Sequence, residues 1–141
     1  MHEYYQLLVP AFTSALAEGL RKTGRFEEAL STIDDAISGA VNSGVKIELS
    51  EMLRIKSLIF AAKTDRESAI CCLTEAIKIA RTQSALAFEL RSTMDLARLR
   101  CEAGQRDQAR HDLALVYDRF TEGFQTADLK EARVLLENLQ S

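Results

Sequence analysis

The chain has 141 residues, a net charge of −3 and a hydrophobic fraction of 47%. This composition excludes a disordered polar segment, and the acidic balance gives no general attraction to nucleic acid or to an anionic membrane surface. We expect a single domain over residues 1–141, large enough to bury roughly two thirds of its unfolded surface.

Helical periodicity follows the whole chain. Near the start, for example, Ala29, Ile33, Ala36 and Ala40 recur at the spacing of one helix face. The many Ala and Leu residues, with no Trp and a single Pro, also favour helices over strands. The predicted helices are 4–23, 26–42, 46–62, 66–83, 86–103, 106–120 and 126–139.

A short polar stretch returns twice at an interval of 40 residues. It reads GRFEEAL at 24–30, TDRESAI at 64–70 and GQRDQAR at 104–110. Self-similarity at such a period indicates stacked structural units. Glycine at the first position suits a helix C-cap, and the acidic residues that follow suit the first turn of the next helix. Each copy is therefore predicted to be the turn between two antiparallel helices. The expected fold is all-α: a superhelix of three helix pairs plus a C-terminal capping helix.

The two ends of this stack differ in their polarity. The last predicted helix has one apolar face, formed by Leu129, Ala132, Leu135, Leu136 and Leu139. This face would seal the C-terminal end. The N-terminal end carries large apolar residues where a polar outer face would be needed: Tyr4, Tyr5, Leu8 and Phe12. We expect these residues to form an interface, either with upstream domains of the same polypeptide or with a second copy in a homodimer.

GRFEEAL followed by Ala36 resembles the tetratricopeptide pattern, in which a glycine turn precedes a small residue that opens the second helix. The usual unit of that family has about 34 residues. The unit of 40 residues here implies longer helices or loops. The resemblance implies a helix-pair superhelix whose first helices line a concave, peptide-binding surface.

A second resemblance covers residues 89–139. The LARL strip, the AGQRDQAR turn, VYDRFTEGF and DLKEARVLL are similar to the C-terminal tail of large bacterial signalling proteins. Such proteins carry a class III nucleotidyl cyclase or a DNA-binding domain, then an NTPase module, then a tetratricopeptide-like region. The chain itself has no GxxxxGK[ST] phosphate loop. The resemblance therefore implies a regulatory part of a larger protein.

Carrying the tetratricopeptide geometry over places a groove on the first helix of each pair. The groove residues would be Ser14, Glu18, Arg21, Lys22, Glu51, Arg54, Leu58, Arg91, Met94, Arg98 and Glu102. Five bases against three acids would make this groove basic, which suits an acidic or C-terminal peptide. The carboxylate clamp of chaperone-binding relatives relies on two asparagines, and Glu18 and Ile55 stand in their places.

Residues that could carry chemistry do not converge in the sequence. Adjacent residues on a helix, such as Cys71 and Cys72, point about 100° apart. We interpret them as packing residues and His111 as a surface side chain. The paired acids Glu27/Glu28 and Asp34/Asp35 read as helix-dipole partners or solvated faces. We therefore expect no catalytic, cofactor-binding or metal-binding residues.

The N-terminal stretch MHEYYQLLVP lacks the basic region and apolar run of a signal peptide, and no apolar run is long enough to cross a bilayer. Three cysteines without a Cys-x-x-Cys spacing indicate a reducing compartment. We expect a cytoplasmic, non-catalytic module that binds a protein or peptide, and neither nucleic acid nor membrane. The alternatives are a nucleic-acid-binding helical repeat and a small helical enzyme or cofactor carrier.

Overall fold

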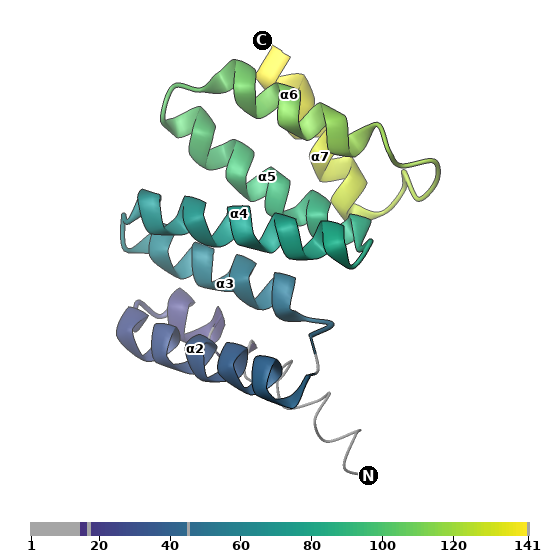
Figure 1. The fold of residues 1–141 in the computed structure, drawn as a ribbon. Helices are drawn as coiled ribbons and strands as arrows, with labels where there is room; N and C mark the ends of the chain where they lie inside the picture. Colours follow the sequence, from purple (N-terminus) through teal and green to yellow (C-terminus); the bar gives the residue numbers. More distant parts are fainter. Residues whose placement is uncertain (1–14, 17, 45, 141) are drawn as a thin grey trace.

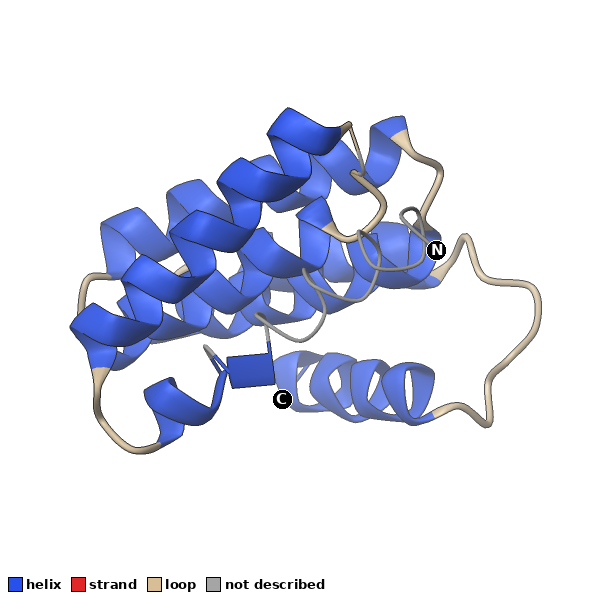
Figure 2. Ribbon diagram, turned by 90° about the horizontal axis from the view of Figure 1, so that it is seen from below, coloured by secondary structure: helices blue, strands red, loops and turns tan. Residues whose placement is uncertain are grey.

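The computed structural model describes residues 15–16, 18–44 and 46–140, and within these residues all regular structure is helical. This confirms the all-α prediction. No helix in these ranges is both long and apolar enough to span a membrane. In the view of Figure 2 the loops gather at the two ends of the helices. The predicted N-terminal interface residues Tyr4, Tyr5, Leu8 and Phe12 lie outside the described residues, as does Ser14 of the predicted groove.

The helices begin and end close to the residues that the sequence predicts. After a helical stretch at 18–22 they are α2 (Phe26–Ser43), α3 (Leu49–Ala62), α4 (Arg66–Thr82), α5 (Leu86–Glu102), α6 (Arg106–Tyr117) and α7 (Ala127–Gln140). The start predicted for α3 is three residues early, because Leu49 N–H donates to Lys46 O in a turn at 3.1 Å. The end predicted for α6 is three residues late, because the chain leaves the helix after Tyr117.

The helices stack in chain order, with α2 at one end and α6 and α7 at the other (Figure 1). Each helix contacts the next one in the chain, and α5 also contacts α3 and α7. Helices α4 and α6, both fully described, make no direct contact with each other. The stack therefore has one face where α3, α5 and α7 meet, and another where α4 and α6 stand apart over α5.

The turns of the stack recur every 20 residues. A left-handed backbone with positive φ occurs at Gly24, Gly44, Thr64, Ser84 and Gly104. At Thr64 the two hydrogen bonds of a Schellman motif close the helix end: Thr64 N–H donates to Ala61 O at 3.0 Å, and Asp65 N–H to Phe60 O at 2.9 Å. The same pair of bonds recurs around residues 24, 84 and 104. The backbone therefore repeats at half the interval that the sequence displays.

The core follows the 40-residue register that the sequence predicts. Ala29, Ala69 and Ala109 are fully buried at the start of α2, α4 and α6. One helical turn later, the fully buried residues are Ile33, Leu73 and Leu113. A small residue near each turn lets the two helices of a pair approach closely, and a branched residue fills the space beyond it. The repeat in the sequence is thus a repeat of core contacts.

Helix α7 keeps the register of α3 and α5. Leu129, Ala132 and Leu139 are buried, and Leu135 and Leu136 are half-buried against α5 and α6. On α5, the residues that pack in the same cluster as α6 are Leu90, Met94 and Ala97. Their equivalents on α7 are Lys130, Val134 and Glu137, all exposed. Helix α7 is therefore apolar toward the stack and mostly polar on the face where α5 meets its partner helix.

Candidate functional site

Most of the predicted groove residues come together on one face of the stack. An open cleft of ≈ 430 Å³ there is lined by Ala15, Glu18, Glu48, Glu51, Arg54, Ile55, Phe88 and Arg91. We call the charged residues of this side the ion-pair face: Glu18, Arg21, Glu51, Arg54, Arg91, Asp95, Arg98, Asp128 and Glu131. Three predicted groove residues play other parts, because Met94 is buried in the core, Leu58 is half-buried and Glu102 approaches Arg66 near a turn at 3.7 Å.

The arginines of this face are neutralised by acids from neighbouring helices. Arg54 on α3 bonds Glu51 at 3.1 Å and also Asp95 on α5 at 3.1 Å. Arg91 on α5 bonds Asp128 on α7 at 2.8 Å. Near it, Arg98 bonds both Asp95 and Glu131, each at 3.0 Å. Toward the start of the chain, Arg21 bonds Glu18 at 2.6 Å.

The basic groove expected from the sequence is therefore wrong in its charge. The sequence count of five bases against three acids omitted Asp95, which stands beside the assumed groove stripe on α5. It also omitted Asp128 and Glu131, because α7 was assigned to sealing the end of the stack and not to lining this face. With these three carboxylates the surplus of positive charge disappears.

Burial and pairing shift the pKa values on this face. Burial opposes the charge of Arg54, but the hydrogen bonds and charges of Glu51 and Asp95 outweigh it and raise its pKa. Burial is also the largest effect on Asp95, and it raises the pKa of that carboxyl although Arg54 and Arg98 lower it. The hydrogen bond from Arg21 lowers the pKa of Glu18. These groups hold one another, which suits a structural network.

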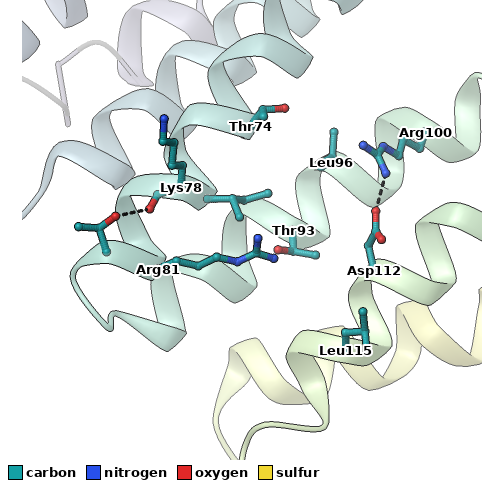
Figure 3. Close-up of a pocket in the computed structure, with 10 residues that line it drawn as sticks. Thr74, Lys78, Arg81, Thr93, Leu96, Arg100, Asp112 and Leu115 are labelled. Atoms are coloured by element: carbon teal, nitrogen blue, oxygen red, sulfur yellow. Dashed lines mark hydrogen bonds and ion pairs between the residues drawn. The ribbon is translucent and has the colours of Figure 1, made fainter.

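A second cleft, of ≈ 490 Å³, lies where α4 and α6 stand apart over α5 (Figure 3). We call it the outer cleft. Its lining is Thr74, Ile77, Lys78, Arg81 and Thr82 from α4, Thr93, Leu96 and Arg100 from α5, and Asp112 and Leu115 from α6. The volume falls within the range of about 300–1,000 Å³ typical of binding pockets. Sequence reasoning missed this cleft, because it depends on the gap between two helices that are not adjacent in the chain.

Positive charge remains in the outer cleft after its ion pairs are made. Arg100 pairs with Asp112, and Figure 3 shows this pair on the side of the cleft opposite Arg81. The Lys78 ammonium makes no ion pair with any described residue. Arg81 bonds Glu89 through Nε at 2.7 Å, and Arg119 bonds the same carboxylate at 2.9 Å. Because two arginines share one carboxylate, that cluster retains a positive charge.

Glu89 anchors Arg81 from inside the protein. Its side chain is 1% exposed, at the start of α5, and its two arginine partners come from the end of α4 and from the residues after α6. The 40-residue register places the buried leucines Leu49 and Leu129 at the equivalent positions. A carboxylate at a position that is otherwise apolar was the signal in the sequence that would have found this cluster.

The lining of the outer cleft departs from the other repeats. Leu115 is 56% exposed, whereas its equivalents Asp35 and Glu75 are acidic. On α4, Lys78 and Arg81 replace the equivalents Ser38 and Val41. The repeat fold does not require apolar or basic residues at these places, because the other units pack without them. The outer cleft is therefore a local specialisation of the stack.

The cysteines and the described histidine are dispersed. Cys71 is exposed, and Cys72 and Cys101 are half-buried. The interpretation of Cys71 as a packing residue is therefore wrong, because its side of α4 faces solvent. Burial raises the pKa of the Cys72 thiol. His111 is exposed on α6, as the sequence predicts.

No protein-family model matches the chain, and no curated protein matches it significantly. The resemblances to tetratricopeptide repeats and to the tails of bacterial signalling proteins thus rest on the residues quoted for them. The internal 40-residue register has separate support from burial and from the backbone at the turns.

Proposed function

We propose that the chain is a non-catalytic interaction and scaffolding module, in which a tetratricopeptide-like stack of helix pairs presents a docking surface to a protein partner. The module would be a regulatory part of a larger signalling protein. The observation that carries the proposal is the outer cleft, which combines exposed Leu115 with the uncompensated cations Lys78 and Arg81. An apolar contact beside fixed charges is the arrangement that peptide-binding surfaces use for affinity and specificity.

The ion-pair face supports the same proposal in another way. Its titratable side chains bond to one another across α3, α5 and α7, as Arg54 does to Asp95 and Arg98 does to Glu131. Groups that are satisfied within the protein stabilise its shape and are poorly placed to exchange protons with a substrate. In this proposal the ion-pair face keeps the stack rigid, and the outer cleft meets the partner.

Selection from a random peptide display library would test this function. The wild-type chain is the bait, and selected peptides are then assayed for binding to Leu115→Glu and to Val134→Glu. The first change restores the acidic type found at the equivalent residues 35 and 75, so the fold should tolerate it. The second alters another exposed apolar residue, on α7, outside the outer cleft.

We expect peptides that bind the wild type and Val134→Glu equally and lose affinity for Leu115→Glu. Failure to enrich any peptide would count against an interaction module. Enriched peptides that bind all three proteins equally would move the docking surface away from the outer cleft.

A nucleic-acid-binding repeat is the second candidate, because the outer cleft contains the three cations Lys78, Arg81 and Arg100. Its lining has no aromatic side chain on which a base could stack. A titration with a labelled single-stranded oligonucleotide at several salt concentrations separates the two functions. Binding that falls steeply with salt and is lost in Lys78→Glu would favour nucleic acid.

A further inference from the structure

We propose that the occupant of the outer cleft is an acidic protein segment that carries one apolar anchor side chain. This inference rests on the proposed interaction function and adds the chemistry of the partner. It follows from three properties of the cleft: an apolar floor, a wall whose free hydrogen-bond donors are cationic, and an arginine fixed in place before any ligand arrives.

The apolar floor calls for an anchor side chain. Ile77 and Leu96 lie on the cleft lining and are buried, whereas Leu115 beside them is 56% exposed. The equivalent of Leu96 in the preceding unit is Lys56, which pairs with Asp34 at 2.7 Å. An ion pair therefore spans the same place in that unit, and apolar surface lines it here. A leucine, isoleucine or phenylalanine of the partner would remove this surface from water.

The polar wall offers donors only from its cations. The hydroxyl of Thr74 donates to Ile70 O at 2.8 Å, that of Thr82 to Lys78 O at 3.0 Å and that of Thr93 to Glu89 O at 2.7 Å. Each hydroxyl hydrogen is thus used within its own helix. The donors left on this wall are the Lys78 ammonium and the Nη groups of Arg81, which select carboxylates.

Arg81 is held ready for such a carboxylate. Its Nε bonds the buried Glu89, and Figure 3 shows the side chain reaching across the cleft toward Thr93. A guanidinium that is fixed through Nε loses little side-chain entropy when its Nη groups bind a ligand. From Thr74 to Thr82 the wall is about 12 Å long, which about four residues of an extended segment would cover.

A charge-exchange experiment with labelled peptides tests the inference. The probes are two peptides of about ten residues, which is ample for this wall. Each has a central leucine, flanked by glutamates in one and by lysines in the other. Their affinities are measured by fluorescence anisotropy for the wild type, for Lys78→Glu and for Lys130→Glu. Lys130 is an exposed lysine on α7 that does not line the outer cleft, so its variant is matched in charge.

We expect the glutamate peptide to bind the wild type and Lys130→Glu alike and to bind Lys78→Glu about tenfold or more weakly. The lysine peptide should show the opposite preference for Lys78→Glu. Replacing the central leucine by asparagine should weaken binding to every variant, because the anchor is lost.

Several results would overturn the inference. One is equal binding of both peptides to the wild type, and another is an equal loss in both lysine variants. Self-association that Leu115→Glu abolishes, measured by light scattering, would make a second copy of the chain the occupant. If the display selection yields cleft-dependent peptides that are not acidic, the inference fails while the proposed function stands. If it yields no peptides at all, the function itself fails.

Discussion

At the scale of single residues, Thr64 has a backbone conformation that β-branched residues rarely adopt. Its φ is 66°, and the equivalent turns have glycine at residues 24 and 104. A non-glycine residue in this region costs about 1–2 kcal/mol, of which the greater flexibility of unfolded glycine offsets about 0.5–1 kcal/mol. Thr64→Gly should therefore raise the free energy of unfolding by about 0.5–1 kcal/mol, as measured by urea denaturation.

The matched control for this change is Thr74→Gly, in the exposed interior of α4. There the same substitution should lower stability by roughly 0.5 kcal/mol, because glycine is a poorer helix former. Equal effects of the two changes would contradict the strain assigned to Thr64.

The alanines at the start of the second helix of each pair are a second feature at this scale. Ala69 is fully buried on α4, where a larger side chain would separate the helix from its neighbours. Ala69→Glu would combine overpacking with an unpaired buried charge and should cost about 3 kcal/mol or more. Cys71→Glu, at an exposed position two residues further on, should change stability by less than about 0.5 kcal/mol. Circular dichroism during thermal and urea unfolding measures both, and a melting point unchanged by Ala69→Glu would contradict the register.

At the scale of the elements, the ion pairs of α3, α5 and α7 differ in burial from those on the outer surface. The side chains of Arg54 and Asp95 are 22% and 13% exposed, whereas Arg133 and Glu137, within α7, are 67% and 68% exposed. A double-mutant cycle with Arg54→Gln and Asp95→Asn should give a coupling of about 1 kcal/mol or more. The same cycle with Arg133→Gln and Glu137→Gln should give less than about 0.5 kcal/mol. A coupling for Arg54 and Asp95 as small as that control would mean that the ion-pair face does not tie the helices together.

The elements also show what the sequence could and could not predict. Helix bounds and core residues were predictable, because Ala29, Ala69 and Ala109 mark a periodic pattern set by local packing. The charge of the predicted groove was not, because it depends on Asp128 and Glu131, which reach Arg91 and Arg98 from a different helix. The outer cleft was not predictable either, since it lies between helices that the chain does not connect directly. Periodicity within a helix is a local property, whereas charge balance and hollows arise from pairs of elements.

At the scale of the whole molecule, the stack has a centre and two ends. Helices α4 and α5 are packed on both sides, whereas α2 and α7 lie toward the ends of the described stack (Figure 1). In a structure whose units contact only their neighbours, the ends open more easily than the centre. Amide hydrogen exchange, followed by mass spectrometry, should therefore be slowest in α4 and α5 and faster in α2 and α7. Uniform protection of all helices would indicate that the chain unfolds as one cooperative unit.

The even spacing of the left-handed turn residues makes the length of the scaffold adjustable. Residues 64 and 104 have the same backbone conformation and the same pair of closing hydrogen bonds. A tandem duplication of residues 65–104 would therefore join the new segment at a turn that the chain already uses. The inserted helices would meet faces like those that α5 and α6 already cover, and a second outer cleft would form along the lengthened stack. Such a protein would display two docking sites at a fixed separation, which would raise the avidity for a partner with two acidic segments.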